Sequence, residues 1–233
     1  MKNFWIFFTI AGLGIMQSCA PVYIPNNTNV PLFTEKGEIQ LAAYHGTNGT
    51  DLQAGVSVID HLAVIGNFEI SSRETEDVED YHKHRFAEVG IGFYDTFGGK
   101  GRYEFYGGYG SGRSETFDYE NIFNVNEGRV KGKFDRWFFQ GNIGIGNKVF
   151  EGALSYRLSY VNFYQFEDLT GSVVHDRPLE ELMMEPAITI KVGGERLKFV
   201  SQWGWSFPYD DYSRFDHQPF FWSMGLQGKI PAW

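Results

Sequence analysis

Residues 134–146, FDRWFFQGNIGIG, decide the fold class of this chain. One side of a two-residue alternation holds Trp137, Phe139, Ile143 and Ile145, and the other holds Arg136, Gln140, Asn142 and Gly144. Successive side chains of a β-strand point to opposite faces, so this stretch is predicted to be a strand with one apolar and one polar face. Residues 181–192 repeat the pattern. Which face points inward separates a soluble protein from a membrane protein.

Ten alternating segments are predicted, each close to the ~9–11 residues that a strand needs to cross a membrane. They span residues 37–45, 51–59, 61–72, 84–95, 102–113, 133–146, 149–163, 182–192, 196–207 and 218–230. Every second link between them is short, and the links between those are mostly long and polar. This asymmetry is typical of outer-membrane barrels. An even strand number places both ends of the chain on the short-turn side, which is the periplasmic side in such barrels.

The volume of the apolar residues indicates which face is inside. The apolar positions hold large side chains, among them Phe139, Leu158 and Trp222, whereas the opposite positions include Gly90, Gly108, Gly144 and Gly204. A narrow barrel interior accepts small side chains more readily than these large ones. We therefore predict an all-β fold, a ten-stranded antiparallel up-and-down transmembrane β-barrel over residues 37–233, with the apolar face toward lipid.

The opposite face carries six acidic and six basic residues. They are Glu38, Glu69, Glu88, Glu104, Glu151 and Glu185, together with Arg102, Arg136, Arg157, Lys191, Lys198 and Lys229. Unpaired charges are costly in a poorly solvated interior, so these residues are predicted to pair as a lumen charge network. An ion-selective pore would carry one dominant sign. The balance predicts a plugged or very narrow barrel, in which these charges have a structural role.

Aromatic residues gather near the predicted strand ends, as expected for two interfacial girdles. The set toward the long loops includes Phe86, Trp137, Tyr160, Trp205 and Trp222, and the set toward the short turns includes Phe93, Tyr103 and Phe199.

The N-terminal residues predict export. Lys2 and the apolar run from Phe4 to Ile15 are typical of a signal peptide, which we place at residues 1–18. Residues Met16 to Cys19 resemble the processing box of bacterial lipoproteins, and this resemblance implies that Cys19 carries lipid. Residues 19–36 are predicted to form a lipidated extended tether, because Pro21, Pro25 and Pro31 disfavour helix and central strand.

Together, the signal, the alternating strands, the loop asymmetry and the terminal Trp233 resemble small bacterial outer-membrane β-barrel proteins. The resemblance covers residues 37–233 and departs from the family pattern at Pro231, just before the C-terminal aromatic residue. It implies the outer membrane of Gram-negative bacteria, contact with membrane lipid and lipopolysaccharide, and the barrel-insertion machinery during assembly. A periplasmic or membrane protein that docks on the tether is a further expected partner.

Composition narrows the function classes. The net charge of −9 argues against nucleic acid as a partner, since no basic stripe is present. No catalytic residue, cofactor or metal site is predicted, and Asp80, His82 and His84 are interpreted as a solvated acidic loop. The preferred function is structural or partner-binding. The alternatives are a small channel and a rim-active enzyme, either a protease that uses Asp210, Asp211, Asp216 and His217 or a lipid A or phospholipid hydrolase that uses a serine such as Ser114.

Overall fold

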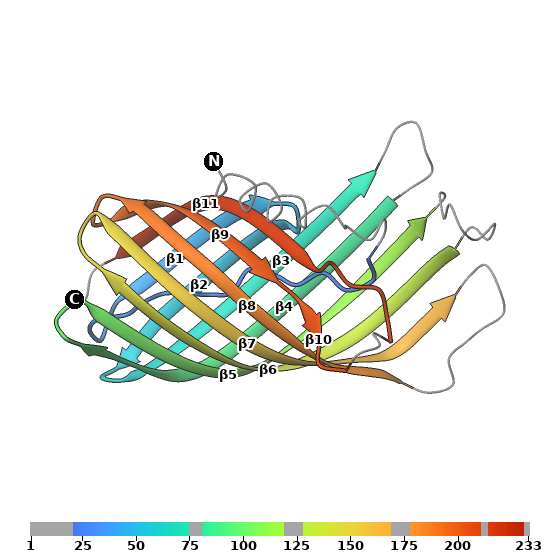
Figure 1. The fold of residues 1–233 in the computed structure, drawn as a ribbon, viewed down its shortest axis with the longest axis horizontal. Helices are drawn as coiled ribbons and strands as arrows, with labels where there is room; N and C mark the ends of the chain where they lie inside the picture. Colours follow the sequence, from blue (N-terminus) through green and yellow to red (C-terminus); the bar gives the residue numbers. More distant parts are fainter. Residues whose placement is uncertain (1–20, 75–80, 119–127, 169–177, 211–213, 231–233) are drawn as a thin grey trace, which may run out of the picture.

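The strands of the protein form one antiparallel sheet (Figure 1). A computed structural model describes residues 21–74, 81–118, 128–168, 178–210 and 214–230. The strands are β1 (Ile39–Gly46), β2 (Gly49–Ile59), β3 (Leu62–Glu74), β4 (Tyr81–Phe97), β5 (Gly101–Asp118), β6 (Gly128–Gly146), β7 (Phe150–Asp168), β8 (Leu179–Gly193), β9 (Leu197–Trp205), β10 (Phe207–Pro208) and β11 (Phe220–Ile230). No helix in these described ranges is long and apolar enough to cross a membrane.

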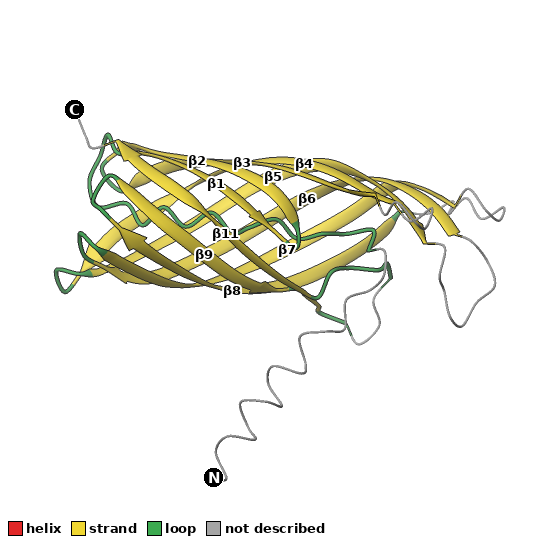
Figure 2. Cartoon of the chain, turned by 90° about the horizontal axis from the view of Figure 1, so that it is seen from above, coloured by secondary structure: helices red, strands yellow, loops and turns green. Residues whose placement is uncertain are grey.

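The sheet closes on itself. Strands β1 to β9 pair in chain order, β9 pairs with β11, and β11 pairs with β1. Short β10 is a continuation of β9. Gly204 of β9 pairs with Ala187 of β8, and Phe207 of β10 pairs with Met184 of β8 in the same register. The closed sheet is therefore the predicted ten-stranded antiparallel barrel (Figure 2).

The two faces of the barrel are as predicted. Phe139 and Trp222 are 57% and 37% exposed on the outside, whereas Arg136 and Arg157 are 1% and 0% exposed inside. The outer surface is a continuous belt of exposed apolar side chains, which include Leu154, Ile145 and Leu226. A belt of this extent is expected of a surface that faces lipid rather than water. The apolar face is thus on the outside of the barrel, as predicted.

The two ends of the barrel differ in strand length. Strands β4 to β8 are 15–19 residues long and continue three to five residues beyond the predicted segments at the long-loop end. The apolar alternation marks only the part of each strand that carries the belt. Beyond it, polar residues such as Lys131 and Glu115 take the outward positions while the backbone ladder continues.

One of the predicted girdle residues, Phe86, is inside the barrel and not in a girdle. Its ring is 2% exposed and stacks on Phe134, with ring centroids 5.5 Å apart. Phe86 has the same parity as the lumen residue Glu88, and parity decides the face of a strand residue more strictly than aromatic character does. Gly110 lies beside the Phe86 ring, where an added Cβ atom would come within 2.4 Å of it. The glycines of the inner face therefore make room for inward aromatic rings.

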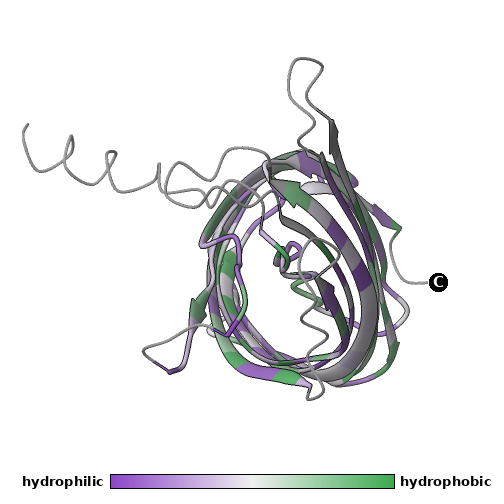
Figure 3. Ribbon diagram, turned by 90° about the vertical axis from the view of Figure 1, so that its right-hand side faces the viewer, coloured by the Kyte–Doolittle hydropathy of each residue, from purple (hydrophilic) through white to green (hydrophobic). Residues whose placement is uncertain are grey.

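Residues 22–33, which precede β1, run through the interior of the barrel. Figure 1 shows them as a blue trace along the barrel, and the view along the barrel axis in Figure 3 shows the ring of strands that surrounds the lumen. This segment has no helix and none of the strands of the sheet, and it lies inside the barrel.

Candidate functional site

The interior of the barrel is occupied by the N-terminal part of the same chain. Every residue from Val22 to Phe33 is buried, and residues 34–36 are exposed. We call residues 22–33 the plug segment. Twelve extended residues reach about 40 Å, which exceeds the ~30 Å of a bilayer core, so the segment is long enough to traverse the lumen.

The direction of the plug segment is fixed at both ends. At the long-loop end, the backbone N–H groups of Val22 and Tyr23 both donate to the carbonyl oxygen of Asp216 at 3.0 Å. At the short-turn end, Lys36 lies 3.7 Å from Asp60 in the turn between β2 and β3. The sequence-based expectation that the residues before the first strand stay on the short-turn side is therefore wrong for the plug segment. Strand count alone cannot reveal a segment that returns through the barrel.

Wall side chains hold the backbone of the plug segment in the manner of a neighbouring strand. Asn27 donates its backbone N–H to Asp51 Oδ2 at 2.7 Å and accepts from Gln53 Nε2 at 2.9 Å. Gln202 alone makes both bonds to Thr28, accepting from the N–H at 2.7 Å and donating to the carbonyl at 3.0 Å. Buried backbone groups need such partners, so the polar wall residues stabilise an irregular segment that has no strand of its own.

Further along, the carbonyl groups of the plug segment accept from the wall. The Asn29 carbonyl accepts from Gln140 Nε2 at 2.7 Å, and the Val30 carbonyl accepts from Lys191 Nζ at 2.5 Å. The Phe33 N–H donates to Glu104 Oε1 at 2.9 Å. Prolines 25 and 31 have no N–H group, which lowers the number of donors that the lumen must satisfy.

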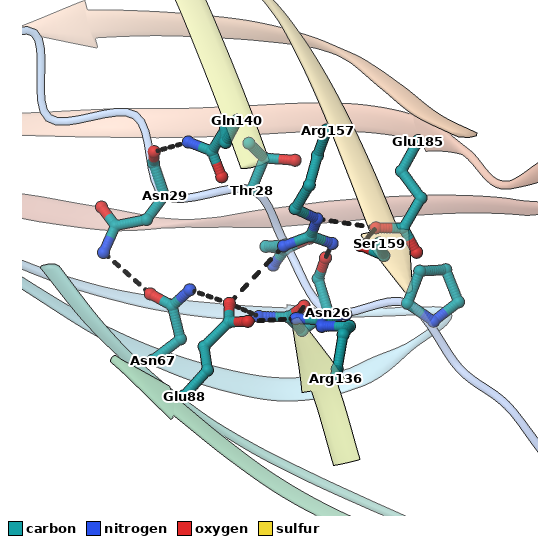
Figure 4. Close-up of polar contacts among 12 residues, drawn as sticks. Asn26, Thr28, Asn29, Asn67, Glu88, Arg136, Gln140, Arg157, Ser159 and Glu185 are labelled. Carbon is teal, nitrogen blue, oxygen red and sulfur yellow. Dashed lines mark hydrogen bonds and ion pairs between the residues drawn. The ribbon is translucent and has the colours of Figure 1, made fainter. Parts of the chain in front are cut away.

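A group of four charged residues surrounds Asn26 of the plug segment (Figure 4). Arg157 donates from Nε to Glu185 at 2.7 Å and from Nη2 to the Asn26 carbonyl at 2.9 Å. Glu88 is paired with Arg136 and lies 3.5 Å from Arg157 Nη1. Arg136 also donates to Asn26 Oδ1 at 2.6 Å. Two acids and two bases therefore neutralise one another around a plug residue. We call these four charged residues the upper charge group.

Tyr23 joins the same group from the long-loop side. Its hydroxyl donates to Glu185 Oε1 and accepts from Arg136 Nη1, at 2.7 and 2.8 Å. Its ring packs edge-on against Phe134 and Phe215, so one side chain of the plug segment combines ionic and apolar contacts.

A second charge group, the lower charge group, is centred on Glu151. Arg102, Lys191 and Lys198 lie 2.9, 3.5 and 3.4 Å from its carboxylate oxygens. Three cations share one carboxylate here, and Lys191 also donates to the Val30 carbonyl of the plug segment. The upper charge group is thus balanced within itself, whereas the lower charge group has two more positive than negative charges.

The remaining predicted lumen charges have different partners. Glu38 pairs with Lys229 at 2.8 Å near the start of β1. Glu104 accepts from Phe33 and Asn142, and Glu69 lies 3.4 Å from His84 Nε2. Neither Glu69 nor Glu104 has a lysine or arginine within ion-pair distance in the described ranges. The structure therefore brings ten of the twelve predicted charges into ion pairs and places the other two beside the plug segment or a histidine.

Apolar contacts complete the fit of the plug segment. Phe33 belongs to a buried cluster with Tyr94, Tyr106 and Phe138. Leu32 packs with Val30 and Ala153, and an added Cβ atom at Gly144 would come within 3.0 Å of Leu32. The absence of a side chain at Gly144 therefore leaves the space that the Leu32 side chain fills.

Sequence reasoning missed five polar residues that bind the plug segment, one carboxylate (Asp51) and four amides. Asp51, Gln53, Asn67, Gln140 and Gln202 all occupy lumen positions of the alternation and are buried. The amide side chains on the inner face were a usable signal for a segment inside the barrel, because a water-filled pore does not need hydrogen-bonding side chains at fixed positions.

The structure bears on the alternative chemistries as well. His82 and His84 are buried inside the barrel, not solvated, whereas Asp80 lies outside the described residues. Ser114 pairs with His84 across β4 and β5, but neither side chain makes a hydrogen bond within the described part of the chain, and both face the lumen rather than lipid. Asp216 and His217 contact the plug segment through their backbone. Asp211 and Cys19 lie outside the described residues.

Comparisons with known proteins concern the fold alone. No protein-family model matches the chain, and no curated protein matches it. Among solved structures, the chain is similar to the translocator domain of the autotransporter NalP from Neisseria meningitidis, with 10% identity, a TM-score of 0.48 and coverage of 83% of this chain and 86% of that chain. It is also similar to the N-terminal β-barrel domain of OprF from Pseudomonas aeruginosa (8% identity, TM-score 0.35, 84% and 98% covered) and to the KdgM porin (11%, 0.36, 83% and 99%).

Proposed function

We propose that this protein is an outer-membrane barrel closed by its own N-terminal segment, with a structural or partner-binding role. The observation that carries the proposal is the burial of all residues from Val22 to Phe33, whose backbone is held by wall side chains from most of the strands. A covalently attached segment with this many specific bonds suits a scaffold. An ion-selective pore instead needs a hydrated path lined by one sign of charge.

The path of the plug segment has a consequence for topology. Long loops of outer-membrane barrels face the cell exterior. The same orientation here places Pro21 at the external rim, because Val22 and Tyr23 bond to the segment before β11 at the long-loop end. The mature N-terminus would then be displayed on the cell surface and not in the periplasm.

The lipoprotein hypothesis changes accordingly. Cys19 precedes Pro21 by two residues, so acyl chains on Cys19 would anchor in the outer leaflet beside the barrel. The signal peptide and the lipoprotein-type processing box support this modification. Partner proteins would meet the long-loop end, because the plug segment is buried and unavailable for docking from the periplasm.

The conductance of the purified protein in planar bilayers tests closure. We expect the intact protein to be silent. A variant with a specific protease site inserted into the exposed residues 34–36 can fold with its plug segment in place. Cleavage followed by mild denaturant would then release residues 21–33 and open the lumen. The control is the intact protein exposed to the same protease. Regular conductance steps from the intact protein would show that the channel alternative is right.

Antibody labelling of whole cells tests the topology. An epitope inserted after residue 20 should be labelled on intact cells. The same epitope in the short turn at Gly98–Gly99 should be labelled only after permeabilisation. The opposite result would place the long-loop end in the periplasm. Incorporation of labelled palmitate, and its loss in Cys19→Ala, tests lipidation separately.

A further inference from the structure

A row of cations crosses the outer surface of the barrel at the long-loop end. Arg85, Arg113 and Lys133 are direct neighbours on β4, β5 and β6, because Arg85 pairs with Arg113 and Arg113 pairs with Lys133. All three are exposed on the lipid-facing parity. The next row toward the loops adds Lys83 and Lys131. We call these five residues the cation row.

The cation row lines a groove of about 570 Å³. Two carboxylates, Glu115 and Glu167, also line it, so the groove has an excess of positive charge on a protein whose net charge is −9. Lys131 lies 3.4 Å from Glu115. In contrast, no acidic residue of the described ranges forms an ion pair with Arg85, Arg113 or Lys133.

This arrangement is unfavourable for the protein alone. Directly opposed residues of antiparallel strands have Cβ atoms about 4.5–5.5 Å apart, and like charges at such positions destabilise the sheet. Asp135 and Glu115 lie two residues from the row on the same face, but neither forms an ion pair with Arg85, Arg113 or Lys133. The three adjacent cations therefore favour an anion from outside. A phosphate group offers several oxygen acceptors to arginine and lysine donors at once.

The height of the cation row matches a lipid headgroup. The exposed rings of Tyr109 and Trp137, with centroids 4.8 Å apart, lie four residues nearer the middle of their strands than Arg113 and Lys133. Four residues correspond to about 13 Å along a strand, or about 10 Å of height at the usual tilt. Ala87, Ser111 and Asp135 lie between the two rows on β4, β5 and β6. The small side chains of Ala87 and Ser111 leave space for a bulky headgroup over β4 and β5.

We infer that the cation row binds the phosphorylated headgroup of an outer-leaflet glycolipid of the lipid A type. Arg85, Arg113 and Lys133 contact the phosphate, while the apolar belt below contacts the acyl chains. The assignment of this site to the outer leaflet rests on the orientation given under the proposed function. The binding of a phosphorylated headgroup by the cation row does not depend on that orientation. Lipid binding to purified protein in detergent tests it without reference to orientation, closure or lipidation.

The test is native mass spectrometry of the detergent-solubilised protein with bisphosphorylated lipid A and with its dephosphorylated form. The test variant is Arg85→Gln/Arg113→Gln/Lys133→Gln. The matched control is Lys100→Gln/Lys148→Gln/Arg196→Gln, which removes three exposed cations from the short-turn end. We expect the test variant to bind bisphosphorylated lipid A on the order of tenfold more weakly, the control to bind like the wild type, and the wild type to prefer the phosphorylated form.

Three results would overturn the assignment. Equal weakening of lipid A binding in both variants would show that the overall charge of the protein, and not the cation row, causes the effect. Equal binding of the dephosphorylated lipid would remove the role of phosphate. Displacement of lipid A by inorganic phosphate at an equal concentration would make the groove a site for free phosphate. All three substituted residues are exposed, so cold gel mobility should show that each variant folds.

Discussion

Replacement of Arg157 by methionine tests whether the upper charge group holds the plug segment. Arg157 is fully buried, and it bonds to Glu185 and to the Asn26 carbonyl while lying beside Glu88. Without it, Glu88 keeps its ion pair with Arg136, and Glu185 keeps only hydrogen bonds from Tyr23 and Ser159. Breaking a buried pair by removing one partner costs about 3–5 kcal/mol, and the unsatisfied carbonyl of Asn26 adds about 1–3 kcal/mol. We expect the free energy of unfolding to fall by about 4–8 kcal/mol.

Two further variants define the cause. In Arg157→Met/Glu185→Gln the surplus carboxylate is removed, so a large part of the lost stability should return. Arg102→Met is the matched control, because Glu151 keeps Lys191 and Lys198 after the change. Arg102 is also more exposed than Arg157, with 12% of its side chain accessible. Its loss should cost no more than about 1 kcal/mol.

The assay is urea unfolding in phospholipid vesicles, followed by tryptophan fluorescence, with cold gel mobility as a second probe of the folded barrel. The dependence of the unfolding free energy on urea should keep its slope, since the folded surface is unchanged. The reasoning is refuted if Arg157→Met loses less than about 1 kcal/mol, or if the double variant is no more stable than the single one.

Two other changes probe the packing at Gly144 and the lipid-facing belt by the same unfolding assay. Gly144→Ala places a methyl group 3.0 Å from Leu32 and 2.9 Å from the carbonyl oxygen of Gly152, and it should cost about 1–3 kcal/mol through overpacking. Gly141→Ala, whose added atom meets Phe105 at an ordinary 3.4 Å, should be nearly neutral. Equal effects would contradict close packing at Gly144. Phe139→Arg should destabilise the barrel in vesicles by about 2–4 kcal/mol if the belt faces hydrocarbon. Lys133→Arg, on the same strand beyond the belt, should have little effect. An unchanged free energy of unfolding in Phe139→Arg would indicate that this face is not in lipid.

The sequence alone determined the barrel. Strand identity and facing direction follow from a two-residue period, and the residues from Trp137 to Ile145 show it without any tertiary information. The twelve lumen charges followed from the same parity. The ends of β4 to β8 did not, because the apolar pattern stops where the strand leaves the belt while its hydrogen bonds continue.

Only the tertiary structure decided what fills the barrel. Nothing in the spacing of Pro25, Asn27 and Pro31 shows whether an extended segment lies outside or inside, because an irregular backbone has no face of its own. Its place depends on partners far away in the sequence, such as Gln202 for Thr28 and Arg157 for Asn26. Those contacts exist only once the sheet has closed. The plug segment thereby places Val22 at the long-loop end of the barrel. The three cations of β4, β5 and β6 form one row because of the register of these neighbouring strands.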